Sequence, residues 1–341
     1  MNVKIHQTLL WAMVVLITIV GCTNKAEAVQ LQSDRQVLRE SRPATGNNIN
    51  PSKDTKWGYC YEPDIKIIRM KDNEYRSYHC KPESGWTGYF EIYHKDRKIY
   101  SERIKNGDFS VCDLNDPLSK CSQMPPLGMD VNGDGIPEMV MERHTGQPQF
   151  TSCYSYPIYS IGRRVRKLDT LEGKHSPMQF KDLDGDGLYE VIGHDWVLAY
   201  YFGDFLSSPH PTIILKWQKG GYRLDFKLMK KPPPAYEELK KKAEDLRRLL
   251  GKENGPFPEG YILNIPYYQH TDAWNYLVDL IYSGNAKAAW AFLDMYWIIP
   301  PECTKFKEKQ QEKREFITAF KKQLAQSHYW KDLRILNGWV K

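Results

Sequence analysis

Residues 56–230 contain short segments rich in aromatic and β-branched residues, separated by Gly, Pro, Asn and Asp. Such runs are typical of strands joined by tight turns. The clearest of them predict strands at residues 74–79, 89–94, 191–201 and 212–217. We therefore expect this part of the chain to be a β-rich region.

The pattern changes after the triple proline at residues 232–234, where apolar residues begin to recur with helical spacing. One apolar stripe predicts a helix at residues 236–250, and a second stripe at 274–281 ends at Gly284. Two further helices are expected at 287–298 and 304–327, the first of them ended by a pair of prolines. The sequence thus predicts an α+β protein, with a β-rich region at 56–230 and a helical domain at 231–341.

The N-terminus has the layout of an export signal. Lys4 precedes an apolar run at residues 9–20, which is shorter than the roughly 20 residues of a membrane-spanning helix. The run leads into Ile19-Val20-Gly21-Cys22, which resembles the bacterial lipobox. That resemblance implies that residues 1–21 are removed and that the Cys22 thiol carries the lipid. The alternative is an ordinary secretory signal in which Cys22 stands by coincidence.

Two features after Cys22 extend this interpretation. Thr23 replaces the Asp that would retain a lipoprotein in the inner membrane, so the resemblance implies an outer-membrane anchor facing the periplasm. The polar composition of the following residues, with almost no apolar periodicity, predicts a lipidated flexible tether at 22–55. We expect a protein of the bacterial cell envelope.

The cysteines suit an oxidising compartment. Seven are present, and no C-x-x-C pair or neighbouring histidine pair suggests a zinc site. The six that remain after Cys22 are disulfide candidates: Cys60, Cys80, Cys112, Cys121, Cys153 and Cys303. Their connectivity is open, and we expect the two local pairs, Cys60 with Cys80 and Cys112 with Cys121. Cys153 would then pair with Cys303, unless these two are free buried thiols.

The most informative feature is an acidic nonapeptide that occurs twice. The segment DVNGDGIPE at residues 130–138 is matched 52 residues later by the similar segment DLDGDGLYE at 182–190. Oxygen side chains at positions 1, 3 and 5 of a tight loop converge, a glycine at position 6 permits the turn, and the carbonyl at position 7 adds an oxygen. The expected ligands are Asp130, Asn132, Asp134, Ile136 and Glu138 in the first copy, and Asp182, Asp184, Asp186, Leu188 and Glu190 in the second.

A hard cation suits such an oxygen shell. Calcium takes six to eight oxygen ligands in irregular geometry, whereas magnesium prefers an octahedron and keeps its water, so calcium is the expected ion. We expect two ions, each with a structural role that locks its loop. The alternative is that each loop is an acidic surface turn that binds nothing strongly.

The spacing separates two kinds of calcium loop. An EF-hand places a bidentate Glu at position 12, but Met141 and Gly193 stand there. A Glu at position 9 followed by strand-like residues resembles the FG-GAP and VCBS repeats of integrin-type β-propellers. That resemblance covers about residues 128–143 and 180–194, departs from the family's usual Asp at position 9, and implies propeller-blade-like repeats. The β-rich region has room for about three or four blades of 40 to 50 residues, too few for a closed seven-bladed ring.

Enzyme motifs such as G-x-S-x-G, H-E-x-x-H or a P-loop are absent from the sequence. His194-Asp195 and His144 follow the two acidic loops, so a metal-dependent periplasmic hydrolase is the alternative to a binding or structural module.

Composition bears on partners. Aromatic residues near the loops suggest a protein or glycan partner in the envelope, although core packing explains most of them. Residues 227–341 hold 20 Lys and Arg against 14 Asp and Glu. Behind an export signal this excess does not indicate nucleic acid, so the expected partners are the membrane through the lipid anchor and an envelope component.

Overall fold

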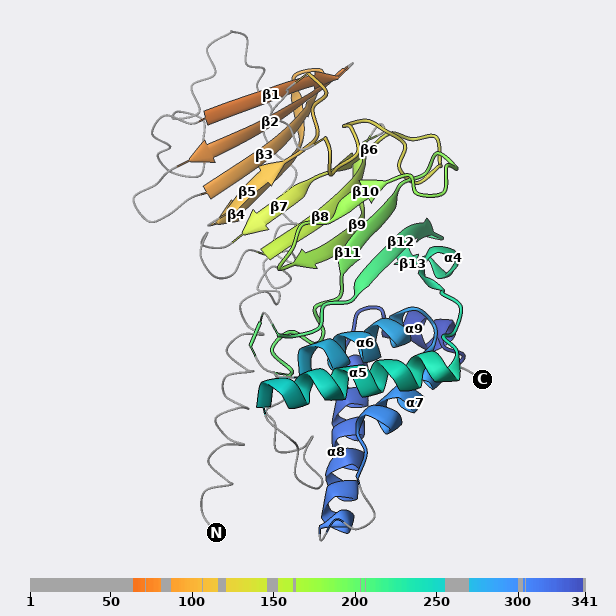
Figure 1. Ribbon diagram of the computed structural model, residues 1–341. Coiled ribbons are helices and arrows are strands. Elements are labelled where there is room, and N and C mark those ends of the chain that lie inside the picture. The colour runs from red at the N-terminus through yellow and green to blue at the C-terminus, as the bar shows by residue number, and fades with distance from the viewer. Residues whose placement is uncertain are drawn as a thin grey trace. The chain divides into compact units, whose positions relative to one another are not determined.

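The computed structural model describes residues 64–70, 72–80, 87–105, 107–115, 121–145, 153–161, 164–202, 204–205, 207–254, 270–299, 303 and 305–339. The predicted signal peptide, the tether with Cys22, and Cys60 lie outside these residues. The described chain divides into two compact units between Tyr189 and Glu190. Strands dominate the first unit and helices the second, so the mixed α+β class with N-terminal sheets and C-terminal helices is confirmed (Figure 1).

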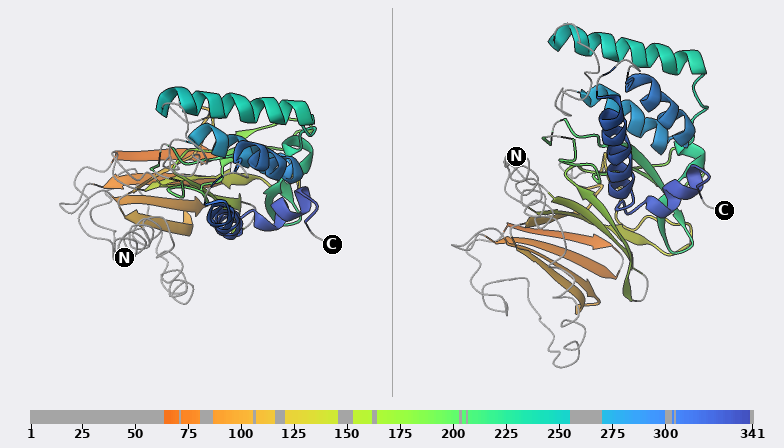
Figure 2. Two further views of the ribbon diagram at one scale, coloured as in Figure 1. Left: turned by 60° about the horizontal axis from the view of Figure 1, so that its bottom comes forward. Right: turned by 90° about the horizontal axis from the view of Figure 1, so that it is seen from below.

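The first unit begins with a four-stranded antiparallel meander, which Figure 2 shows in orange with its strands side by side. Its strands are β1 (Asp64–Met70), β2 (Asn73–Cys80), β3 (Thr87–His94) and β4 (Arg97–Lys105). The register pairs Tyr75 with Ile92 and Ile92 with Tyr100, so these side chains share one face of the sheet. Tyr75 and Ile92 are buried on that face, as expected for a sheet with one solvated side.

A second antiparallel sheet supplies the other half of the core. It contains β5 (Gly107–Ser110), β6 (Glu138–Val140), β7 (Glu142–Thr145), β8 (Cys153–Ile161) and β9 (Val165–Lys174), and the unit also holds the short β10 (Gln179–Lys181). The buried side chains of the two sheets form one hydrophobic cluster: Tyr75, Phe90, Ile92, Phe109, Val111, Met139, Met141, Tyr159 and Ile161. Both sheets are therefore parts of one folded unit.

Strands β6 and β7 both pair with β8 and are separated only by Met141. The Met141 backbone N–H donates to the carbonyl of Pro157, 3.1 Å away. Proline has no N–H to return a second ladder bond, so the pairing is interrupted at this point. Strand β6, which begins at Glu138, pairs with β8 through Met139 and Val140 on the other side of this interruption.

The second unit combines three antiparallel strands with helices. Its strands are β11 (Glu190–His194), β12 (Thr212–Gln218) and β13 (Gly221–Leu224). Its helices are α4 (Phe226–Met229), α5 (Tyr236–Asn254), α6 (Thr271–Tyr282), α7 (Ala286–Tyr296), α8 (Phe306–Leu324) and α9 (Trp330–Leu336). The first helix, α4, begins a few residues before the predicted boundary at 230, and the compact unit itself begins at Glu190.

The helical stripes bury as the sequence predicted. Leu239, Ala243, Leu246 and Leu250 of α5 are all buried. Helix α6 ends before Gly284, whose φ of +78° is a left-handed conformation that glycine adopts without strain. Helix α8 buries apolar residues only in its second half, and Figure 1 shows its first half extending beyond the other helices.

Aromatic rings fill the core of the second unit. Trp274 stacks on Phe202 and on Phe316, with 5.1 Å between ring centroids in both pairs, and Phe316 stacks on Phe320. Large rings bury much apolar area and gain further from offset stacking. The high aromatic content of the sequence is thus used for packing here.

The predicted strand at 191–201 is wrong in its second half. Strand β11 ends at His194, and the chain turns from Trp196 onward. The cause is Asp195, whose carboxylate accepts a hydrogen bond from the Val197 backbone N–H at 3.0 Å and so turns the chain locally.

The cysteines follow the local expectation in one case and depart from it in another. Cys112 and Cys121 form a disulfide, with their Cα atoms 4.7 Å apart. The expected bond between Cys153 and Cys303 is wrong, since Cys303 is a free thiol and Cys153 is bonded to another cysteine. The expected Cys60–Cys80 pair lies outside the described side chains.

None of the helices in the described part of the chain has the length and apolar character of a membrane-spanning segment.

Candidate metal centre

Backbone hydrogen bonds join the two ends of the first acidic loop. The Gly128 N–H donates to the Glu138 carbonyl, and the Glu138 N–H donates to the Met129 carbonyl, each at 2.9 Å. Glu138 is also the first residue of β6. The loop is therefore a short excursion whose two ends are held together by backbone hydrogen bonds.

Asp130 organises the interior of this loop. Its two carboxylate oxygens accept hydrogen bonds from the N–H groups of Gly133, at 2.7 Å, and Gly135, at 2.8 Å. Both glycines have a φ of +79°, a conformation that other residues adopt only with strain. The sequence D-x-N-G-D-G thus places glycine at the two positions where the backbone must turn towards the first aspartate.

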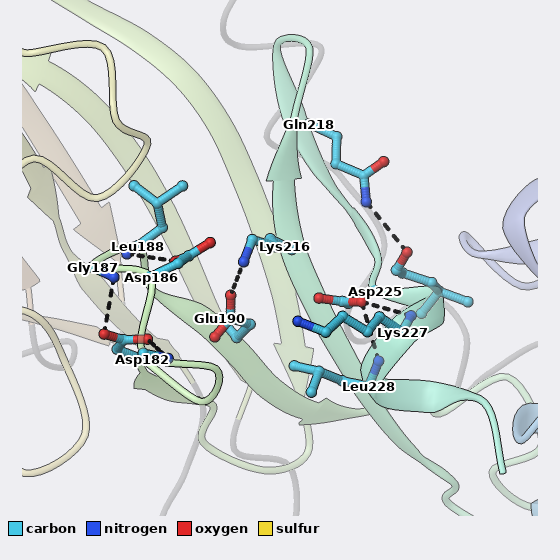
Figure 3. Close-up of polar contacts among 12 residues, drawn as sticks. Asp182, Asp186, Gly187, Leu188, Glu190, Lys216, Gln218, Asp225, Lys227 and Leu228 are labelled. Carbon is cyan, nitrogen blue, oxygen red and sulfur yellow. Dashed lines mark hydrogen bonds and ion pairs between the residues drawn. The ribbon is translucent and has the colours of Figure 1, made fainter.

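The second loop repeats three hydrogen bonds of the first. Asp182 accepts from Gly185 at 2.7 Å and from Gly187 at 3.1 Å, and both glycines have positive φ. The Leu188 N–H donates to Asp186 at 2.9 Å, as the Ile136 N–H donates to Asp134 at 2.8 Å in the first loop. Figure 3 shows the second set of contacts. The internal repeat predicted from the sequence is therefore also a repeat of backbone conformation.

Each loop gathers three carboxylates. One oxygen from each of Asp130, Asp134 and Glu138 lies within 4.8 Å of the others, and the same holds for Asp182, Asp184 and Glu190. The two groups use positions 1, 5 and 9 in the first loop and 1, 3 and 9 in the second.

The other predicted ligands lie around these groups. Asn132 is buried, and its side-chain oxygen accepts from the Asp134 N–H at 2.8 Å. Asp186 is held by the Leu188 N–H, and the Ile136 side chain is exposed.

Glu138 is the most unusual residue of the first loop. Its side chain is 1% exposed, and one carboxylate oxygen, Oε2, accepts from the Val131 N–H at 3.0 Å. The other, Oε1, is buried without a hydrogen-bond partner in the described structure. Burial, reinforced by the nearby charges of Asp130 and Asp134, raises the pKa of Glu138 to about 7.

Such an arrangement fits a hard divalent cation. A buried carboxylate oxygen without a partner is costly, and repulsion among three carboxylates adds to that cost. A cation bound by these oxygens would remove both penalties, and an oxygen-only donor set suits calcium or magnesium better than zinc or copper. The residues of the first loop therefore fit the predicted metal.

Glu190, the last residue of the second loop, differs from Glu138 of the first loop because it forms an ion pair with a lysine. The Lys216 Nζ lies 2.9 Å from Glu190 Oε1, and Glu190 is fully buried (Figure 3). Sequence reasoning missed Lys216, although a lone lysine in the apolar strand TIILKW was an available signal. The two loops thus share a backbone conformation but carry different charges.

No protein-family model, no curated protein and no solved structure matches the chain. The candidate site therefore stands on its own geometry.

The two histidines of the hydrolase alternative make other contacts. His194 Nδ1 lies 3.0 Å from the carbonyl oxygen of His210, and the His194 ring packs edge-on against Trp196. Burial lowers the pKa of His194. The His144 ring stacks on Tyr154, with centroids 4.6 Å apart. Both rings therefore pack against a neighbouring aromatic side chain, and His144 Nε2 is buried without a hydrogen-bond partner among the described residues.

Proposed function

We propose that the chain is an exported bacterial lipoprotein whose two acidic loops bind calcium, and that it works in the cell envelope as a binding or structural module. The observation that carries the calcium proposal is Glu138, a buried carboxylate with one oxygen lacking a hydrogen bond, beside two further carboxylates. A second loop that repeats three hydrogen bonds of the first, on the same spacing of aspartate and glycine, supports it.

The proposal extends to the architecture around the loops. The second loop directly joins β10 to β11, as a loop does in a blade of the FG-GAP or VCBS type. The first loop leads directly into β6, whereas β5 ends at Ser110, well before Asp130. We propose that these are blade-like repeats of an open arrangement. The ion in each would be structural, holding oxygens that otherwise repel.

Calcium is expected to raise the melting temperature of the protein. Much of this rise should depend on the Glu138 carboxylate. A ligand at 100 times its dissociation constant stabilises by about 2.7 kcal/mol, which corresponds to a rise in melting temperature of roughly 5 to 10 °C for a folded unit of about 150 to 250 residues. Glu138→Gln keeps the shape but removes the charge, so we expect most of the first loop's share of this gain to disappear. The measurement is thermal unfolding by circular dichroism in calcium and in chelator.

The change in stability that Glu138→Gln causes in chelator provides a second check. Because burial and two neighbouring aspartates oppose ionisation of Glu138, the neutral Gln should leave the calcium-free protein as stable as before or more so. Glu172→Gln, at an exposed position of β9, is the matched control and should keep the full calcium response. A wild-type melting curve that ignores calcium would refute the metal proposal.

The lipid anchor has its own test. Intact-mass spectrometry of the protein from bacterial membranes should show a chain that begins at Cys22 and carries diacylglycerol. Cys22→Ser should be found in the soluble periplasmic fraction at the mass of the unmodified chain. An unmodified Cys22 in the wild-type protein would contradict the anchor and leave the calcium proposal intact.

Recognition is the proposed role of the anchored protein, towards an envelope protein or glycan. The aromatic residues that suggested a glycan surface are largely internal: Tyr156, Tyr159, Trp196 and Phe202 are all buried. This favours a protein partner over a sugar-stacking surface.

A further inference from the structure

The two acidic loops contact each other within the first unit. A Cβ built on Gly133 would lie 2.9 Å from Cδ2 of Leu188, closer than real Cβ atoms come to a neighbour. The Leu188 side chain of the second loop therefore packs against the bare backbone of the first. Gly185 is the equivalent glycine of the second loop, and a Cβ built on it would have no neighbour within 4 Å. The first loop therefore places no side chain on the glycine of the second.

Leu188 and Gly133 each belong to a candidate ligand set. Leu188 occupies position 7 of its loop, where the backbone carbonyl is an expected ligand, and its N–H donates to Asp186. Gly133 lies between Asn132 and Asp134, and its N–H donates to Asp130. One leucine thus takes part in the second loop through its backbone and supports the first loop through its side chain.

We propose that Leu188 is a positioning residue that couples the two calcium sites, so that an ion in the second loop strengthens binding in the first. This inference rests on the proposed calcium binding. An ion that fixes the Leu188 backbone also fixes the side chain lying on Gly133. The ligands on either side of Gly133 then lose less freedom when the first loop binds. Linkage requires the effect to be mutual, so the first ion also strengthens the second site.

The first loop has one half that is held rigidly and one half that the Leu188 side chain can stabilise. Glu138 is almost fully buried, and its Oε1 has no hydrogen-bond partner among the described residues. The position of this buried group is fixed by β6, whereas the exposed part of the loop around Gly133 is held by hydrogen bonds to side chains. Support from Leu188 therefore acts on the adjustable half of the site.

The test is a thermodynamic cycle measured by calorimetric titration of the purified protein with calcium chloride. Wild type gives the product of the two binding constants, Asp182→Asn gives the first loop alone, and Asp130→Asn gives the second loop alone. The ratio of the wild-type product to the product of the two single-loop constants is the coupling factor. We expect a factor of at least about five, since allosteric coupling factors are typically 5 to 150.

Repeating the cycle in a Leu188→Ala background should bring the factor to about one while two ions still bind, because the side chain contributes no ligand atom. Leu114→Ala, the same change at an exposed position outside both loops, is the matched control and should preserve coupling. Gly133→Ala should weaken binding more than Gly185→Ala, since both have positive φ but only the former meets Leu188.

The outcomes separate the two proposals. Two ions that bind independently in wild type, or coupling that survives Leu188→Ala, would overturn the inference and leave calcium binding in place. Absence of any binding heat in wild type, together with an unchanged melting temperature, would overturn both.

Discussion

Lys216→Met is expected to lower the free energy of unfolding in chelator by about 3 to 5 kcal/mol, the usual cost of removing one partner of a buried ion pair. Glu190 is fully buried and lies 2.9 Å from the Lys216 ammonium, whose side chain is 19% exposed. The variant keeps the aliphatic stem and removes only the charge. Denaturant unfolding followed by circular dichroism is the measurement.

Calcium should return much of this loss if Glu190 is an ion ligand, because the ion would supply the positive charge that lysine no longer provides. Lys216→Arg, which keeps the charge, should lose far less. Lys240→Met, at an exposed position of α5, should be nearly neutral. An equal loss in calcium and in chelator would show that Glu190 serves Lys216 alone, and would argue against an ion in the second loop.

Asp195→Ala is expected to destabilise the second unit by about 3 to 5 kcal/mol, because hydrogen bonds to a charged group contribute about 1.5 to 3 kcal/mol each and do not add fully. Asp195 is buried and accepts from the Tyr282 hydroxyl at 2.7 Å, the Val197 N–H at 3.0 Å and the Ser327 hydroxyl. Truncation leaves these donors buried without their acceptor.

Tyr282→Phe provides the comparison, since it removes one donor and leaves the other two in place. It should cost a fraction of the Asp195→Ala loss. Thermal unfolding in chelator keeps any contribution from the acidic loops constant. A loss below 1 kcal/mol for Asp195→Ala would mean that water replaces the carboxylate, contrary to the burial of this group.

The acidic loops could be located from sequence because their chemistry is local. A nine-residue spacing of oxygen side chains and glycines sets a backbone path through hydrogen bonds within the segment itself, as Asp130 and Asp182 show. The strand after each glutamate was predicted for the same reason and is observed as β6 and β11. The identity of the ion and the role of the protein stay predictions.

Features that depend on residues far apart in the chain were not predictable. The Glu190–Lys216 pair and the Leu188–Gly133 contact join separate segments, and no spacing rule reports them. The error at Cys153 and Cys303 has the same origin, because that pairing followed only from assigning the local pairs first. Asp195 ends a strand that composition alone extended, because its carboxylate accepts from the nearby Val197 N–H, and the hydroxyl donors that also hold this carboxylate lie much later in the chain.

The base of the first loop is held by bonds that involve no ligand oxygen. Two backbone hydrogen bonds close it at Gly128 and Glu138, and just upstream the Cys112–Cys121 disulfide and the Leu127 N–H to the Cys112 carbonyl fix the incoming chain. Opening of the loop is therefore a local event confined to its tip. In hydrogen exchange, the amides of Gly133 and Gly135 should respond to calcium while those of Gly128 and Glu138 stay protected.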